Sequence, residues 1–311
     1  MSTEVALKKK LKLLWYLVSK ALQAWSSDNA AQLAAAIAFY CIFSIPPLLI
    51  IAMAVAGHFI NTETARIQLI AQIDAATGLQ TAEFIQSLLT NSTQTATSPI
   101  ASIIGGVVLL AGASGIFYQI QYALNRIWNV PKKPVRSLFK TAKDQTLAYL
   151  MVLLIGLLFM VILILSTLLS VLIGNVNGFT QNVLLLEALN FLVLFVTITV
   201  LVAVVYRVIP DKEITWTDVW LGAAVTALLF MLGKYAIGIY LSVSKSGSAY
   251  GAAGSLIVLL TWIYYSTQIF LLGAEFTHTY SLKFGSHPTH VEIGPSKIVE
   301  VPTQEKLPHE G

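Results

Sequence analysis

The stretch QTLAYLMVLLIGLLFMVILILSTLLSVLIGNVNGFTQNVLLL, residues 145–186, contains no charged residue. A membrane-spanning helix needs about 20 predominantly apolar residues, so the stretch is too long for a single span. A polar, glycine-rich break at residues 174–178 divides it in two. The sequence therefore predicts one span at residues 146–173 and a second, after Glu187, at residues 188–206.

The composition of the whole chain supports the same environment. Of the 311 residues, 56% are hydrophobic and only 11% are charged, whereas a soluble domain carries about 25% charged residues. Much of the surface must therefore face lipid, where only helices or closed barrels can satisfy the backbone. Barrel strands alternate apolar and polar residues, and this chain instead has long continuous apolar runs. The predicted fold class is an all-α, polytopic integral membrane protein.

Four other apolar stretches have the length of a span, which gives six predicted transmembrane helices. An external segment between the first two spans has apolar residues at helical spacing, and we expect short helices there that cap the outer face. In chain order, we expect a cytoplasmic amphipathic helix at 1–27 and a membrane domain at 28–282 with spans at 33–57, 100–124, 146–173, 188–206, 216–240 and 251–276. The external segment is expected at 61–98, and a disordered cytoplasmic tail at 283–311.

The placement of lysine and arginine predicts the orientation. Sixteen of these residues fall in the N-terminal segment, the second-to-third and fourth-to-fifth connections and the tail, whereas two fall on the opposite side. Cytoplasmic loops are the ones enriched in Lys and Arg. We therefore expect both termini in the cytoplasm.

The N-terminal segment predicts a surface helix. Leucines and aromatic residues from Leu7 to Trp25 recur at helical spacing, and five lysines between Lys8 and Lys20 supply a cationic side. Such a helix suits the interface of an anionic leaflet, so membrane lipids, anionic at the basic inner face, are the expected partners. The alternative is a helix that packs on a neighbouring cytoplasmic loop. A homo-oligomer is compatible with either arrangement.

Pro46 and Pro47 lie near the middle of the first predicted span. Proline removes a helical hydrogen bond, and broken helices often mark transporter sites. The alternative is a packing kink without further function. Tyr40 and Tyr264 are polar aromatic residues in the first and sixth spans, and they are candidates for the lining of a substrate path.

Ionisable residues inside spans are costly and point to function. Lys234 lies in the fifth span, where it could meet Glu187 or extend outward, and Glu275 lies at the cytoplasmic end of the sixth. Arg126 and Arg207, also at inner helix ends, are the expected ion-pair partners of Glu275. A purely structural ion pair is the alternative. Just before the first span, Asp28 and its neighbour Asn29 are expected to cap that helix.

No constellation of catalytic residues is present in the sequence. Of the five histidines, one follows the first span and four, beginning with His278, are expected in the tail; none has metal-ligand spacing. The single cysteine, Cys41, excludes an intrachain disulfide and is expected to be a packing residue. We therefore expect no enzyme activity, no catalytic residue, no cofactor, no metal and no nucleic acid.

Several segments together resemble the YihY/BrkB family of bacterial inner-membrane proteins. The family's usual Tyr-Tyr pair is Phe39-Tyr40 here. The matching segments are Asp28, Ala34–Tyr40, Phe43–Leu48, Ala123–Trp128, Trp220–Ala223, Tyr250–Gly254, Trp262–Tyr265 and Leu272–Glu275. The resemblance implies a six-span fold in the bacterial inner membrane. Some members were labelled a ribonuclease, but this sequence lacks the metal ligands and basic groove that a nuclease needs. Others have been tied to serum resistance and to export of lipopolysaccharide precursors.

Two functions are compatible with these features. The first is a transporter or flippase for a lipid or an envelope glycolipid precursor, with Pro46, Pro47, Tyr40, Lys234, Glu275, Arg126, Arg207 and Tyr264 as the candidate substrate path. The second is a non-transporting membrane scaffold that recruits partners through the basic loop at 126–143 and the N-terminal helix. By analogy with the family, an envelope lipid is the favoured substrate class.

Overall fold

The computed structural model describes residues 2–59, 61–77, 79–95, 99–131, 183–212, 214–244 and 254–284, with residues 146 and 150. Every regular element in these ranges is an α-helix. The helices are α1 (Ser2–Ser27), α2 (Ala30–Phe59), α3 (Thr62–Thr77), α4 (Leu79–Thr95), α5 (Pro99–Ile127), α7 (Val183–Val208), α8 (Trp216–Ser244) and α10 (Gly254–Phe284).

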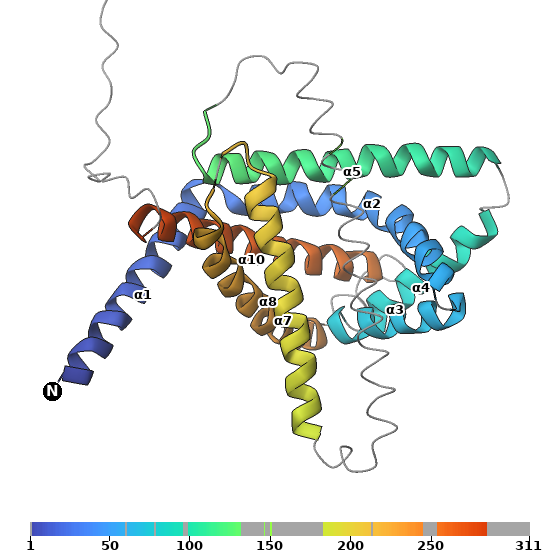
Figure 1. The fold of residues 1–311 in the computed structure, drawn as a ribbon. Helices are drawn as coiled ribbons and strands as arrows, with labels where there is room; N and C mark the ends of the chain where they lie inside the picture. Colours follow the sequence, from blue (N-terminus) through green and yellow to red (C-terminus); the bar gives the residue numbers. More distant parts are fainter. Residues whose placement is uncertain are drawn as a thin grey trace, which may run out of the picture.

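Helix α10 is the centre of the arrangement, because it packs against α8, α2 and α1. Figure 1 shows α2 and α5 side by side with α10 along them, while α1 leaves one end of this group and the short helices α3 and α4 lie at the other. Helices α7 and α8 pack together beside α10. The helices expected in the external segment are therefore present as α3 and α4.

Three helices in the described residues are long and apolar enough to cross a membrane. They are α7, α8 and α10, which match the predicted spans at 188–206, 216–240 and 251–276. Helices α1 and α2 pass the same criterion only as a bent pair, Lys12–Ser27 with Ala30–Ile45, at an angle of 68°. Three or four of the six predicted spans are thus supported by the length and apolar character of a helix. Helix α5 contains the predicted span at 100–124. The predicted span at 146–173 lies outside the described residues, apart from residues 146 and 150.

The prolines do not end the first long helix. Helix α2 continues through Pro46 and Pro47, and the break of 68° lies instead at the turn between α1 and α2. The cause is local: Asn29 has a φ of 54°, a left-handed conformation that stops one helix before the next begins. The prolines therefore lie within a continuous helix, and a separate break precedes it.

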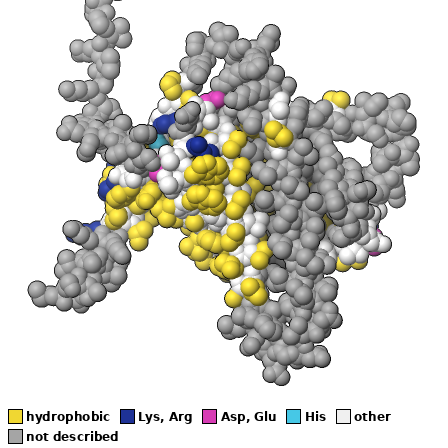
Figure 2. Space-filling view, in the orientation of Figure 1, with side chains coloured by type: hydrophobic (Ala, Val, Ile, Leu, Met, Phe, Trp, Pro, Cys, Tyr) yellow, Lys and Arg dark blue, Asp and Glu magenta, His cyan; other side chains and the backbone are white. Residues whose placement is uncertain are grey.

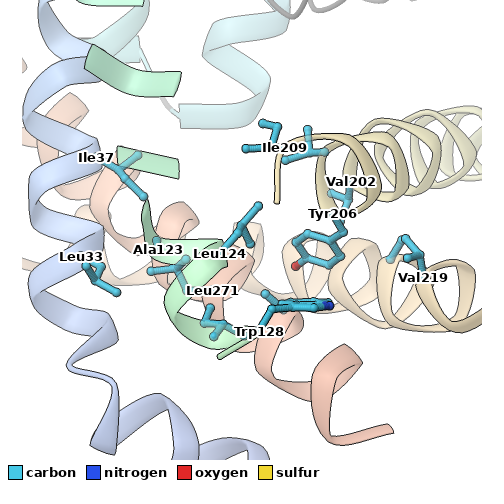
Figure 3. Close-up of a cluster of buried hydrophobic side chains, with 14 of the residues drawn as sticks. Leu33, Ile37, Ala123, Leu124, Trp128, Val202, Tyr206, Ile209, Val219 and Leu271 are labelled. Atoms are coloured by element: carbon cyan, nitrogen blue, oxygen red, sulfur yellow. The ribbon is translucent and has the colours of Figure 1, made fainter. Parts of the chain in front are cut away.

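A large apolar core holds the helices together at the end where α1 lies. It is built from α2, α5, α7, α8 and α10, and Trp128 and Tyr206 are its largest fully buried side chains. Figure 3 shows both rings within this cluster, with Leu124 and Leu271 nearby. Cys41 packs between this core and the smaller one formed by α2, α3, α4 and α10, which agrees with its expected packing role.

Helices α8 and α10 approach closely through a reciprocal pair of contacts. Gly222 of α8 faces Thr277 of α10, and Gly273 of α10 faces Thr226 of α8, so tightly that a methyl group at either glycine would overlap the threonine. Each threonine donates to the carbonyl of the glycine one turn before it, Thr226 to Gly222 at 2.8 Å and Thr277 to Gly273 at 2.7 Å. Small residues of this kind let membrane helices pack at short range.

We expect Gly222→Ala and Gly273→Ala each to destabilise the protein by about 1–3 kcal/mol, the range for an overpacked core. Because alanine favours helices more than glycine does, a loss of stability would have to come from the overlap with the threonine. The measurement is the thermal melting temperature in detergent, with Leu232→Ala, at an exposed position of α8, as the control. Unchanged melting of both glycine variants would contradict the close packing.

Candidate functional site

Glu275 is the most deeply buried ionisable residue of the predicted site. It lies on α10 with 1% of its surface exposed, and its Oε1 atom has no hydrogen-bond partner among the described groups. Leaving a buried carboxyl oxygen without a partner is costly in a protein interior and more so beside lipid. How the Glu275 carboxyl group is stabilised therefore depends on the groups around it.

Asp28, in the turn between α1 and α2, supplies the nearest carboxyl group. Asn29 closes the turn with its backbone carbonyl, which accepts from the N–H groups of Gln32 at 2.9 Å and Leu33 at 3.2 Å. The Asp28 side chain reaches across to α5, where its Oδ1 lies 3.5 Å from Nε of Arg126. The turn thus presents the Asp28 carboxylate to the helix group, where a cap of α2 was expected.

Asp28 and Glu275 interact directly. Their carboxyl groups are within reach of a shared hydrogen bond, and Asp28 also acts electrostatically on the imidazole of His278, one turn further along α10. The predicted ion pair of Glu275 with Arg126 or Arg207 is not formed within 4.0 Å in the described part of the chain. Arg126 reaches Asp28 instead, and the guanidinium of Arg207 lies 5.3 Å from the centre of the Trp216 ring.

His278 is part of this cluster and not of the tail. It is buried in α10, with its ring stacked on Trp128 at 5.6 Å between centroids. Lys212, which also acts on His278, donates to the carbonyl of Trp128 at 3.3 Å. The sequence carried one signal that was missed: His278 follows Glu275 by three residues, so both lie on one face of a helix.

The connection after α7 is fastened to the end of α5 by several hydrogen bonds. Asn125 donates from Nδ2 to the Asp211 carboxylate at 2.9 Å, and the Asp211 N–H donates to Oδ1 of Asn125 at 2.8 Å. Gln121, one turn earlier, donates to the carbonyl of Ile209 at 3.4 Å. These contacts hold Lys212 and Trp128 where they meet His278.

Tyr206 links three helices below the ionisable cluster. Its hydroxyl, fully buried on α7, donates to the carbonyl of Phe270 on α10 at 2.5 Å and lies 3.2 Å from Oγ1 of Thr226 on α8. Its ring lies 6.2 Å from that of Trp128 between centroids. Figure 3 shows both side chains in the buried cluster. Tyr206 could not be predicted as a site residue, since an isolated tyrosine in an apolar run has no distinguishing pattern.

The remaining candidates lie elsewhere. Tyr40 is half-buried on α2 and packs against Gly115 of α5, while Tyr264 of α10 is half-buried where the two apolar cores meet. The backbones of Pro46, Pro47 and Lys234 lie in α2 and α8, but their side chains are outside the described residues. Among the predicted residues, the structure therefore brings Glu275 and Arg126 to one cluster, with Asp28 between them.

Metal chemistry finds no support in this cluster. The described residues contain no group of three His, Cys, Asp or Glu side chains arranged to hold a metal ion. What the cluster does offer is two adjacent carboxyl groups, one guanidinium and one buried imidazole. Such a set can bind or pass protons and can attract a charged group, which are the usual roles of ionisable residues within membranes.

Comparison with known proteins agrees with the sequence resemblance. The chain is similar to a UPF0761 membrane protein of Cronobacter sakazakii, 29% identical over 285 residues, which cover 86% of this chain and 87% of the relative. It is 31% identical to a UPF0761 membrane protein of Actinobacillus pleuropneumoniae over 268 residues, 83% of this chain and 91% of the relative. No solved structure matches it significantly.

The matched region covers almost all of the described helices. The family described as virulence factor BrkB matches residues 21–292, from the end of α1 past the end of α10. The turn with Asp28, the end of α5 with Arg126 and the helix with Glu275 all lie inside it. The chain is thus a membrane protein of the YihY/BrkB family.

Proposed function

We propose that this protein moves a lipid or an envelope glycolipid precursor across the bacterial inner membrane, with both termini in the cytoplasm. The observation that carries the proposal is the burial of Glu275 in α10, near Asp28 and with no hydrogen-bond partner for Oε1 among the described residues. Ionisable groups that face the interior of a helix bundle mark substrate or ion pathways more often than simple packing sites.

Cations and aromatic rings at the same end of the molecule support a lipid as the cargo. Lys283 at the end of α10 places Nζ 3.8 Å from the centre of the Tyr16 ring on α1, and Trp15 beside it is 75% exposed. In the view of Figure 2, hydrophobic side chains make up much of the described surface, and Lys and Arg side chains lie toward the end from which α1 leaves. Amphipathic aromatic residues with cations suit the headgroup region of an anionic leaflet.

A path for the cargo would follow α2 and α10. Tyr40 and Tyr264 offer hydroxyl groups on these helices, and Pro46 and Pro47 loosen the backbone bonding of α2 near its middle. Arg126 of α5 stands at the expected inner end of these helices, beside the buried Glu275 of α10. The path thus begins among charges at the cytoplasmic rim and continues along polar aromatic side chains.

A membrane scaffold is the second candidate. The exposed face of α1, with Leu14, Trp15 and Val18, could bind a partner protein as well as lipid. A scaffold, however, gains nothing from the buried carboxyl pair, which is why transport is the better proposal.

Glu275→Gln keeps the size of the side chain and removes its charge, and we expect it to slow lipid movement. Loss of an interaction of about 1.4 kcal/mol at the transport barrier would lower the rate roughly tenfold. The measurement is the transfer of a fluorescent phospholipid across the membrane of proteoliposomes. Glu63→Gln, which removes an exposed carboxylate paired with Arg66 at 3.0 Å, is the matched control. Equal rates in the wild type and Glu275→Gln would remove Glu275 from the path.

Native mass spectrometry of protein extracted with its lipids tests the basic rim. We expect the wild type to retain an anionic lipid and Lys283→Ala to lose most of it, since a basic residue near an anionic leaflet contributes about 1 kcal/mol. Arg66→Ala, on α3 at the far end of the molecule, should retain the lipid. A wild type without lipid, together with a stoichiometric partner protein, would favour the scaffold.

A further inference from the structure

Asp28 and Glu275 form a carboxyl pair with too little positive charge around it. Among the described residues, Arg126 is the cation within ion-pair distance, with Nε 3.5 Å from Asp28 Oδ1. Glu275 itself is 1% exposed, and its Oε1 is without a hydrogen-bond partner in the part of the chain that is described. If both carboxyl groups were ionised, Arg126 would be paired with Asp28, and the Glu275 carboxylate would be left buried without an ion-pair partner among the described residues.

The size of the site restricts what can restore neutrality. A buried charge without a partner costs several kcal/mol, so a positive ligand is strongly favoured. Glu275 has almost no exposed surface, and its neighbours along α10, Leu271 and Ala274, are also fully buried. A lipid headgroup cannot reach such an atom without displacing the helices, and a proton can.

We propose that Asp28 and Glu275 form a proton-binding site that holds one proton between the α1–α2 turn and α10. When the proton is bound, Arg126 neutralises Asp28 and the turn stays closed on α10. When the proton leaves to water, a second negative charge appears beside the first, and the turn opens to let water reach it. The proton site deepens the proposed function and rests on it in one respect: proton release would drive the movement of lipid.

The groups around the pair fit this role. Helix α8 meets α10 through the uncharged residues Gly222 and Thr226. The ionisable and charged groups are Asp28 from the α1–α2 turn, Arg126 from α5, His278 from α10, and Asp211 and Lys212 from the connection after α7. Of these, Asp211 is engaged with Asn125 and Lys212 with the Trp128 carbonyl.

Infrared spectroscopy of the protein in lipid vesicles tests the site directly, because a protonated carboxyl group has a C=O stretch that shifts in D₂O. We expect the wild type to show such a band at neutral pH and to lose it reversibly at higher pH. Glu275→Gln should abolish the band, and the exposed-site control Glu63→Gln should keep it. No band in the wild type, or a band that survives in Glu275→Gln, would overturn the proposal.

A measurement on the wild type alone guards against a variant that fails to fold. Hydrogen exchange of the peptide around the α1–α2 turn, corrected for the intrinsic effect of pH, should accelerate over the pH range in which the band disappears. Exchange that does not change over that range would overturn the opening of the turn.

Lipid movement in proteoliposomes with an imposed pH gradient separates the two proposals. We expect the gradient to change the rate in the wild type and to have no effect in Glu275→Gln. A protein that shows the infrared band and moves no lipid would contradict the proposed function alone. A protein that moves lipid at a rate independent of the gradient, without the band, would overturn the proton site alone.

Discussion

The structure depends on one constraint: α10 carries a carboxyl group into a place where water cannot reach it. Glu275 is buried in α10, the helix that packs against α1, α2 and α8, and several elements place ionisable groups near it. The α1–α2 turn brings a second carboxyl, the end of α5 brings Arg126, and α10 itself adds His278 one turn later. An element that moved away would change the electrostatic balance of all the others.

Close packing keeps α10 in that position. The two Gly–Thr contacts with α8 fix the distance between the helices, and the Tyr206 hydroxyl ties α7 to both through Phe270 and Thr226. These contacts are short and neutral, so they are insensitive to protonation. The opposite side of α10 faces Asp28, where the contact depends on charge. The helix thus has a fixed side and a side that can respond.

A feature of this fold could be predicted from the sequence where its signal lies within one segment of the chain. Spans α7, α8 and α10 were predicted because hydropathy is summed along the chain, and it needs no knowledge of neighbours. The partners of Glu275 were not predicted, because pairing depends on which helices are in contact. The position of Arg126 and Arg207 at helix ends favoured them as partners of Glu275. In the structure, Arg126 lies beside Asp28 instead. Asp28 fits the local pattern of a helix cap. His278 was assigned to the tail because it follows the apolar run, whereas α10 continues beyond that run to Phe284.

The break between α1 and α2 explains why the carboxyl pair favours transport over a static role. Asn29 turns the chain by 68° with a left-handed residue, and Asp28 beside it is tied down mainly by charge. A structural site would be stabler with apolar residues in place of a buried, incompletely compensated cluster. Keeping a charge at a bend, opposite a helix held firmly on its other side, is useful only if the bend moves. The bend lies between α1, which has exposed aromatic residues, and α2, so a movement there would be transmitted to both helices.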